Sequence, residues 1–429
     1  MNIAIFTNTF TPHVGGVARS VEAFVAEYRA LGHKVLVVAP EFADMPQHET
    51  DVVRIAAIQN FNASDFSVAL PIHDQLSEIL DAFAPDIIHS QHPFLLGMTA
   101  LRTARYRQLP LVFTHHTLYE QYTHYVPGDS ATMQRFAIEL ATRYANLCDQ
   151  IIAPSQSIAT LLQQRGVTKP VEVIPTGVYP QRFAQGDGQA VRQQQGIAAD
   201  AFVIGHLGRL APEKNLEFLA HAVANVAVEC GKVHFFVVGA GPSEQAIRAI
   251  FAQAGVADKL HLTGVLQQQQ LVDALHAMDI FAFASSSETQ GMVLTEAMAA
   301  GLPVVALDAP GVREVVKHGV NGLLLQEKTP VTFSAALRQL IDAPAQQLLA
   351  LQQGARATAE AFSMPRSAAK ALQCFRAVLD RQPAGAGAER DWEDVLAWVK
   401  AEWDILRSVA GAGSTAVGST LFADSAGQP

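Results

Sequence analysis

Short apolar runs alternate with helical stretches along most of the chain, and this alternation begins twice. The first series ends near residue 174, and the same pattern starts again at residue 202. Parallel strands joined by helices produce such a pattern, so two successive doubly wound α/β domains are expected. The predicted strands are Asn2–Phe6, Lys34–Ala39, Asp51–Ile55, Asp86–His89, Leu111–His115, Gln150–Ala153, Glu172–Ile174, Phe202–Leu207, Val233–Val238, Leu260–Leu262, Ile280–Ala284 and Val304–Ala306.

The connection between the two expected domains is a stretch of turn-forming residues. Ile174–Val178 contains Pro and Gly, and the polar stretch Gln185–Gln189 follows it. We therefore expect one Rossmann-like domain over residues 1–180 and a second over residues 181–361. Ligands of doubly wound sheets bind beyond the carboxyl ends of the strands, so two facing domains would enclose a central cleft.

The last part of the chain is expected to form a broken helix and a tail. Residues Ala355–Leu379 have helical composition, with a break at Phe362–Pro365. The tail, 383–429, carries all three tryptophans in a stretch, Glu389–Arg407, that holds six acidic and three basic residues. This charge suits an anionic bilayer poorly, so packing against the body or another subunit is favoured over membrane docking. Residues 410–429 are small and polar and are expected to be disordered.

Composition and charge limit the classes of function. The 429 residues are 49% hydrophobic and 16% charged, which suits two domains with large cores. A net charge of −10 argues against a broad nucleic-acid surface. Three widely spaced cysteines suggest neither a disulfide framework nor a zinc site. No Lys or Arg precedes Arg19, so the charged start of a signal peptide is not expected. With no apolar run long enough to span a bilayer, a cytoplasmic location with at most peripheral contact at the inner face of the membrane is expected.

The segment from Ser285 to Gly301 is the most informative for function. It places Glu288 and Glu296 on either side of a helix start, directly after the predicted strand Ile280–Ala284. Backbone amides at a helix N-terminus favour an anion such as a diphosphate. The two carboxylates could bind hydroxyl groups on either side of it, an arrangement that suits a nucleotide-sugar. The residues expected at this helix start are Gln290, Gly291, Met292 and Val293.

Two further segments could contact the same diphosphate. Arg209 and Lys214 follow the strand Phe202–Leu207, and a lysine at the start of a helix opposes the helix dipole, which favours a ligand-binding role. Gly15 and Gly16 lie between the first strand and a helix, where absent side chains let the backbone approach a phosphate or sugar. A Gly-Gly pair before a helix is weak evidence alone.

A Gly-x-Gly pair and a polar cluster remain to be explained. Gly239 and Gly241 follow a strand, but Glu244 stands where a dinucleotide-binding motif has its third glycine, so a dehydrogenase is improbable. The segment from Thr114 to Pro127 is rich in His and Tyr and lies beyond a strand end. Such a cluster suits substrate binding better than core packing, although a hydrogen-bonded loop with structural histidines remains the alternative.

Taken together, these motifs resemble those of retaining glycosyltransferases of the GT-B architecture, family 4 type. The spacing of Glu288 and Glu296 is similar to the Glu-x7-Glu signature of that family, and Pro310–Glu314 and Asn321–Leu324 complete its donor-binding block. The His-Thr-x-Tyr-Glu pattern after Thr114 is similar to the branch that glucosylates diacylglycerol. The resemblance covers residues 1–380.

The resemblance implies roles for individual residues. Glu288, Arg209, Lys214 and His116 would serve the reaction, His116 by contacting the donor hexose. The nucleotide would lie along Gly239 and Gly241, with its base near Val265, and Tyr119 and Glu120 would face the acceptor. The helix at 362–382 would cross back onto the first domain.

The resemblance also implies a reaction: same-face transfer of a hexose from a nucleotide-sugar, UDP-glucose in this branch, to a lipid such as 1,2-diacylglycerol. No Asp-x-Asp metal motif occurs, so metal-independent transfer without a cofactor is expected. The helix around Leu101–Arg107 could meet lipid headgroups or be an ordinary core-facing helix. The alternatives are glucosyl or mannosyl transfer to a polysaccharide or soluble acceptor, an epimerase or hydrolase, and a non-catalytic sugar-nucleotide sensor.

Overall fold

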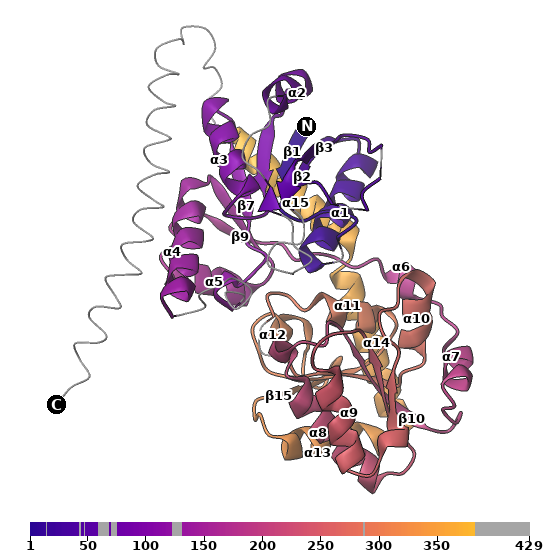
Figure 1. Cartoon of the computed structure of the whole chain (residues 1–429). Coiled ribbons are helices and arrows are strands. Elements are labelled where there is room, and N and C mark those ends of the chain that lie inside the picture. Colours follow the sequence, from indigo (N-terminus) through magenta and orange to yellow (C-terminus); the bar gives the residue numbers. More distant parts are fainter. Residues whose placement is uncertain are drawn as a thin grey trace, which may run out of the picture. The chain divides into compact units, whose positions relative to one another are not determined.

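The computed structural model describes residues 1–13, 15–42, 44–46, 48–58, 68–69, 75–121, 131–285 and 288–381. These residues form two compact units, shown in Figure 1. The first comprises Met1–Pro175 together with the chain from Ser367 onward, and the second comprises Thr176–Arg366. The first crossing between units therefore lies five residues before the expected boundary at 180/181. The expected tail, 383–429, lies outside the described residues.

The N-terminal unit is built on a parallel sheet of seven strands in the order β3-β2-β1-β6-β7-β8-β9. A short antiparallel pair, β4 (Ala57–Ile58) and β5 (Val68–Ala69), stands apart from it. The strands are β1 (Asn2–Phe6), β2 (Lys34–Pro40), β3 (Val52–Ile55), β6 (Ile87–Ser90), β7 (Leu111–Thr114), β8 (Gln150–Ala153) and β9 (Val171–Val173). The helices are α1 (Gly16–Ala30), α2 (Leu76–Phe83), α3 (Leu96–Tyr106), α4 (Ala131–Leu147) and α5 (Gln156–Gln164), with a 3₁₀ turn η2 (Tyr119–Gln121).

The C-terminal unit is built on a parallel sheet of six strands in the order β12-β11-β10-β13-β14-β15. The strands are β10 (Phe202–Leu207), β11 (Val233–Val238), β12 (Leu260–Leu262), β13 (Ile280–Phe283), β14 (Val304–Leu307) and β15 (Gly322–Leu325). The helices are α6 (Pro180–Phe183), α7 (Gly188–Gln194), α8 (Leu216–Glu229), α9 (Glu244–Gln253), α10 (Gln268–His276), α11 (Met292–Ala299), α12 (Val312–Val315), α13 (Pro330–Ile341) and α14 (Ala345–Ala361), with 3₁₀ turns η4 (Pro212–Lys214) and η5 (Ala257–Lys259).

Both sheets confirm the prediction of two doubly wound Rossmann-like domains. In each unit the strand order reverses once, between β1 and β6 in the first and between β10 and β13 in the second. Ligands of such folds bind beyond the carboxyl ends of the strands at this reversal. The topology alone therefore directs attention to the loops that follow β1, β6, β10 and β13.

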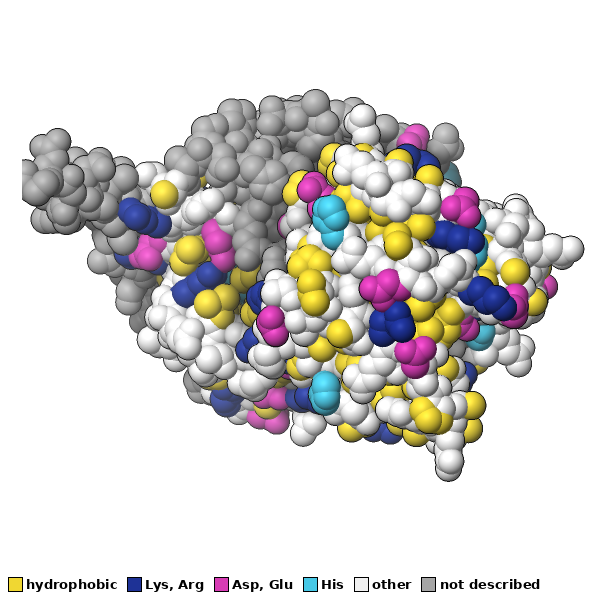
Figure 2. Space-filling view, turned by 90° about the horizontal axis from the view of Figure 1, so that it is seen from below, with side chains coloured by type: hydrophobic (Ala, Val, Ile, Leu, Met, Phe, Trp, Pro, Cys, Tyr) yellow, Lys and Arg dark blue, Asp and Glu magenta, His cyan; other side chains and the backbone are white. Residues whose placement is uncertain are grey.

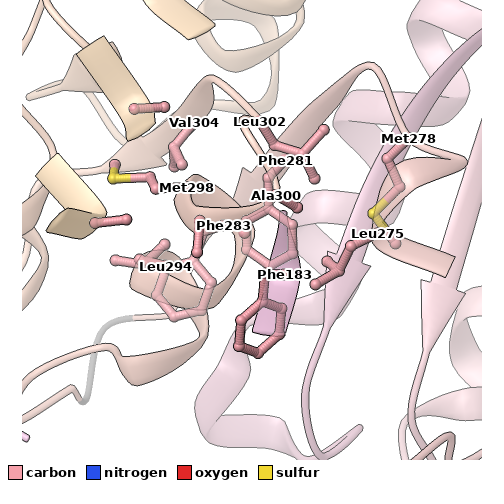
Figure 3. Packing of buried hydrophobic residues seen from close by; sticks show 14 of the residues in the cluster. Phe183, Leu275, Met278, Phe281, Phe283, Leu294, Met298, Ala300, Leu302 and Val304 are labelled. Atoms are coloured by element: carbon pink, nitrogen blue, oxygen red, sulfur yellow. The ribbon is translucent and has the colours of Figure 1, made fainter. Parts of the chain in front are cut away.

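Apolar side chains cover both faces of the second sheet, and one cluster supports helix α11. The rings of Phe281 and Phe283 lie 6.3 Å apart at its centre. Figure 3 shows Leu294 and Met298 of α11 on the side of Phe283, with Leu275 and Met278 on the other side. Because α11 is packed on a rigid strand, its N-terminal end is held firmly at the edge of the sheet.

The predicted strands are all present, each within about one residue of its expected ends. The strand β15, however, was not predicted. It begins at Gly322, where a Cβ would lie 1.9 Å from the carbonyl oxygen of Val304. The run of leucines that follows carries no alternation, so only its pairing with β14 makes it a strand.

The predicted break near Phe362 separates α14 from α15 (Met364–Asp380). Helix α15 lies against the N-terminal unit, where the ring of Phe375 contacts Tyr28 and His89. Lys370 adds a hydrogen bond of 2.7 Å to the carbonyl oxygen of Val173. The second crossing between units falls at Arg366/Ser367, inside this helix and five residues after the expected boundary at 361/362.

Candidate active site

The strand-order reversal of the C-terminal unit collects the charged residues that the sequence singled out. Gly208 and Arg209 directly follow β10, and Glu288 follows β13. These two strands are neighbours and pair at Ile204 and Ile280. The parallel arrangement therefore brings two segments that lie about eighty residues apart in sequence to one edge of the sheet.

The clearest contact at this edge joins Lys214 to Glu288. The Nζ atom of Lys214 lies 2.5 Å from Oε1 of Glu288, and the two side chains are only 18% and 14% exposed. Asn215 reinforces the connection with a hydrogen bond to the carbonyl oxygen of Ala284. Because a half-buried ion pair is weakly screened by water, each charge fixes the position of the other.

Arg209 is held by a carboxylate of its own loop. Its Nη2 atom donates to Oε1 of Glu213, and Ser285 donates to the backbone carbonyl of Glu213. The Arg209 side chain is 48% exposed, whereas Glu213 is 12% exposed. A guanidinium is a planar group of N–H donors, and the exposed side of Arg209 is accessible to an anion.

Gly239 and Gly241 place the Arg209 loop. A Cβ at Gly239 would lie 1.9 Å from the carbonyl oxygen of Gly208, and one at Gly241 would lie 2.4 Å from that of Leu210. Both glycines also have positive φ angles of 142° and 153°. The structure thus gives these residues a supporting role, since they let the loop with Arg209 lie directly on the end of β11.

Helix α11 begins at the same edge. Gly291 precedes it with φ 74° and ψ 54°, a left-handed conformation that glycine adopts without strain. Met292 and Val293 form the first turn and are half-buried, and Glu296 is buried about one turn further on. Helix α11 therefore begins four residues after Glu288, and the amides of a helix start favour an anion.

Gln290 and Val265 differ in how they meet solvent. Gln290 is 4% exposed and its side-chain amide is bonded to the backbone of Thr176. Val265 follows Gly264 and is 62% exposed, as a residue that meets a ligand through its backbone can be. An exposed valine is also common on protein surfaces and decides nothing alone.

In the N-terminal unit, Gly15 and Gly16 lie at the start of α1. Gly15 is extended, with φ −160°, and Gly16 is the first helical residue. A Cβ on Gly16 would meet nothing within 4 Å, and one on Gly15 would meet only the ring of His13. Among the described residues, therefore, no contact requires glycine at Gly16.

His116 belongs to a group of histidines at the carboxyl ends of β6 and β7. Its Nε2 atom lies 2.7 Å from Oε1 of Gln91, and Nδ1 of His92 accepts from the amide of Asn8. Burial lowers the pKa of His116 to about 4 and that of His92 to about 3. Both rings are therefore neutral at pH 7, so His116 is suited to hydrogen bonding and not to donating a proton.

Tyr119 and Glu120 follow this group, and both are engaged inside the unit. The Tyr119 hydroxyl is buried, and its ring makes edge contacts with Phe94 and His115. Glu120 forms an ion pair of 2.6 Å with Arg165, with both side chains less than 20% exposed. The rest of the His- and Tyr-rich loop, residues 122–130, lies outside the described residues.

The helix that could have met lipid headgroups, α3, is core-facing. Its apolar side is buried at Leu96, Ala100 and Leu101. Arg105 donates to the carbonyl oxygen of Leu147, and Arg107 pairs with Asp81. The arginines thus hold the solvated edge of an ordinary helix.

The described residues offer neither a metal-binding group nor a membrane-spanning helix. Within that part of the chain, no three His, Cys, Asp or Glu side chains are grouped to hold a metal ion. Nor does any helix there have the length and apolar character to cross a membrane. On the face drawn in Figure 2, basic side chains lie beside acidic ones.

Three supporting residues were missed in the sequence: Glu213, Gln91 and Arg165. Only Glu213 carried a signal, because it stands four positions after Arg209 in a turn-rich segment. Gln91 and Arg165 contact residues 25 and 45 positions away, and such pairings depend on the strand order.

Comparison with known proteins identifies the family of the chain. The model of Glycosyltransferase Family 4 matches residues 14–182, and that of Glycosyl transferases group 1 matches residues 187–358. The chain is 29% identical over 350 residues to an alpha-monoglucosyldiacylglycerol synthase of Streptococcus pneumoniae, covering 80% of this chain and 79% of that protein. It is 30% identical over 339 residues to a GDP-mannose-dependent alpha-mannosyltransferase of Mycobacterium tuberculosis, covering 76% and 84%.

Among solved structures, the sucrose-phosphate synthase of Thermosynechococcus elongatus superposes with a TM-score of 0.72 at 19% identity, covering 89% of this chain and 99% of that one. At this identity the likeness shows the fold alone, and the fold is the GT-B pair of Rossmann-like domains. From the matching models, the relatives and the architecture together, the chain belongs to the GT-B glycosyltransferases, with a family 4 N-terminal part and a group 1 C-terminal part.

Proposed function

We propose that this glycosyltransferase moves glucose from UDP-glucose to 1,2-diacylglycerol with retention of the anomeric configuration. The observation that carries the proposal is a set of two ion pairs, Arg209 with Glu213 and Lys214 with Glu288, at the strand-order reversal of the C-terminal unit, here called the ionic cluster. Two cations and a helix start suit a diphosphate, and a neighbouring carboxylate suits the hydroxyl groups of a sugar.

The choice of the glucosyl group and of the acceptor is supported by the relatives. Proteins of Streptococcus pneumoniae and Acholeplasma laidlawii, 29% and 26% identical, are both named alpha-monoglucosyldiacylglycerol synthase. These names specify a glucosyl group, an alpha linkage and a diacylglycerol. We carry that chemistry over as the proposal for this chain.

The proposed reaction takes place on one face of the sugar. The acceptor hydroxyl oxygen bonds to the anomeric carbon as the bond between that carbon and the β-phosphate oxygen breaks. The departing β-phosphate oxygen takes the proton of the acceptor hydroxyl. Arg209 and Lys214 would stabilise the negative charge that develops on the diphosphate. Glu288 would bind the hexose hydroxyls and form no covalent intermediate. His116, neutral at pH 7, would add a hydrogen bond to the hexose.

We further propose that no metal ion or cofactor is needed, since Arg209, Lys214 and the first amides of α11 supply the positive charge that a divalent ion provides elsewhere. A diacylglycerol acceptor resides in a bilayer. We therefore propose that the enzyme is cytoplasmic and meets the membrane peripherally.

A second candidate is transfer of mannose from GDP-mannose to a polysaccharide or soluble acceptor. The relative of Mycobacterium tuberculosis favours it, because that protein is named a GDP-mannose-dependent alpha-mannosyltransferase and is 30% identical. The ionic cluster at Lys214 and Glu288 would serve either donor.

The test is a panel that crosses UDP-glucose, UDP-galactose and GDP-mannose with diacylglycerol vesicles and soluble sugars, with products identified by mass spectrometry. We expect glucosyl-diacylglycerol from UDP-glucose at a rate at least tenfold above any other pair. Mannosyl transfer would select the second candidate. Product formation without any acceptor would indicate an epimerase or hydrolase, and binding without turnover would indicate a sensor.

A further inference from the structure

The side chain of Gln290 is bound twice to the backbone of one residue. Its Oε1 atom accepts from the amide of Thr176 at 2.7 Å, and its Nε2 atom donates to the carbonyl oxygen of Thr176 at 2.5 Å. Gln290 is 4% exposed. Because the amide uses its acceptor and a donor on the same residue, its position and orientation are both fixed.

Thr176 is itself firmly held. It is the first residue of the C-terminal unit, and Val178, two residues on, is hydrogen-bonded through both its amide and its carbonyl to the bend between α14 and α15. The amide of Val178 donates to Phe362, and the amide of Met364 donates to Val178, at 2.9 and 2.7 Å. A Cβ on Gly177 would lie 2.3 Å from the Cα atom of Met364, so the two segments are in direct backbone contact.

Gln290 stands two residues after Glu288. A Cβ on Gly311 would lie 2.7 Å from the backbone nitrogen of Gln290, so the loop is also packed from this side. The same loop carries Glu288 to its contact with Lys214. The side chain of Gln290 therefore connects the Glu288 loop to a fixed point 114 residues away in sequence.

We propose that Gln290 is a positioning residue, which holds the Glu288 carboxylate in place by fixing its loop to Thr176. The side-chain amide is committed to Thr176 and does not bind the donor itself. The inference deepens the proposed function, since it rests on Glu288 acting on the donor sugar. Supporting residues of this kind set the geometry of the groups that touch substrate.

The loss of Gln290 should appear in turnover more than in donor binding. Displacing a reacting group by about 1 Å can cost roughly 100-fold in rate, whereas the diphosphate contacts of Arg209 and Lys214 remain. We expect Gln290→Ala to lower kcat about 10- to 100-fold and to change the Kd of UDP less than threefold. A direct donor contact would instead weaken UDP-glucose binding and kcat/KM together while leaving the loop unaltered.

Gln290→Glu separates this contact from simple loss of stability. An ionised glutamate opposes the carbonyl oxygen of Thr176, but a protonated one can donate to it and still accept from the Thr176 amide. The kcat of Gln290→Glu relative to the native enzyme should therefore rise as the pH is lowered from 8 to 6. A ratio independent of pH would contradict the proposal.

Gln150→Ala is the matched control. Gln150 is 5% exposed, and its Nε2 atom donates to the carbonyl oxygens of Ile151 and Pro170 in the N-terminal unit. This variant should lose stability to a similar degree yet keep kcat within about twofold of the native value. An equal loss of kcat in both variants would show that Gln290 acts only through stability.

Hydrogen exchange supplies a readout that needs no turnover. In Gln290→Ala, with UDP absent, amides over residues 288–294 should exchange at least tenfold faster, and those of β13 should not. Unchanged exchange over 288–294 overturns the inference. If the native enzyme transferred no hexose to any acceptor, the proposed function would fail, and this measurement would still decide the role of Gln290.

Discussion

At the scale of single residues, the candidate site depends on coupled charges. Lys214 and Glu288 are both mostly buried and lie 2.5 Å apart, so removal of either charge changes the electrostatic surroundings of the other. Removal of one partner of a buried pair typically costs several kcal/mol, because the remaining charge is poorly solvated. Variants at this pair should therefore change both stability and activity, and the two effects must be measured separately.

Glu288→Ala tests the role of this carboxylate. We expect kcat to fall at least 100-fold, or about 2.7 kcal/mol of transition-state stabilisation, because the hexose loses its anchor. Circular dichroism should show the fold intact. The double variant Glu288→Ala with Lys214→Met should recover stability but not activity, and recovery of turnover would contradict the assignment.

Mass spectrometry of the native enzyme tests the same-face mechanism, with Glu288→Ala as the control. With the native enzyme and a slow donor, intact-protein mass spectrometry should reveal no covalent glycosyl-enzyme, since no carboxylate acts as a nucleophile in the proposed reaction. A stable adduct on Glu288, abolished in Glu288→Ala, would overturn the mechanism.

The buried histidines of the N-terminal unit make stability depend on pH. Burial lowers the pKa of His115 to about 3, and both its ring nitrogens are buried without a hydrogen-bond partner. In the unfolded chain the His115 ring takes up a proton near pH 6.5, whereas in the folded protein it does so only near pH 3. The contribution of neutral His115 to the free energy of unfolding is therefore complete above pH 6.5 and is lost as the pH falls toward 3. The expected loss at pH 5 is on the order of 1–2 kcal/mol for such a group.

His115→Phe should remove this dependence. The ring contacts with Phe113 and Tyr119 can be kept, and two unsatisfied nitrogens disappear. Denaturant unfolding at pH 7.5, 6 and 5 should show equal or higher stability at pH 7.5 and a smaller fall toward pH 5. The exposed His221→Gln serves as control and should leave the pH dependence unchanged, and an identical slope in His115→Phe would refute the argument.

At the scale of elements, helix starts and strand ends carry the site. The loops after β10 and β13 hold the charges, and Leu294 and Met298 pack α11 on the side of Phe283 (Figure 3). Gly239 and Gly241 are required by the close contact with the Arg209 loop, whereas Gly16 is not required by any contact in the fold. A glycine before a helix can thus be required by a close backbone contact, as at Gly239 and Gly241, or lie in open space, as at Gly16.

Gly16→Ala tests whether the start of α1 meets substrate. Alanine favours a helix by about 0.5–1 kcal/mol over glycine, and nothing lies within 4 Å of the added Cβ, so the melting temperature should hold or rise. We expect kcat/KM for the donor to fall at least tenfold if phosphate or sugar approaches this backbone. Gly231→Ala, equally unobstructed and outside the site, should leave activity within twofold; unchanged activity in Gly16→Ala would remove this helix start from the site.

At the scale of the whole molecule, the sequence predicted two doubly wound domains because hydrophobic alternation and strand length are local properties. It also singled out Glu288, Arg209 and Lys214, which lie in the loops after β13 and β10, and the structure joins Lys214 to Glu288. It could not predict β15, which is a strand only through its pairing with β14. The pairing of Glu120 with Arg165 and of Gln290 with Thr176 was equally out of reach, because these contacts join residues that the fold brings together.

The most direct measurement combines donor, acceptor, metal and stereochemistry. The purified enzyme is incubated with UDP-glucose and diacylglycerol vesicles, with and without EDTA, and the anomeric proton of the product is observed by NMR. We predict alpha-glucosyl-diacylglycerol in both samples at rates within twofold of each other, because Arg209, Lys214 and the amides of α11 replace a metal ion. A beta-linked product, a large loss of rate in EDTA, or no glucolipid would contradict the account.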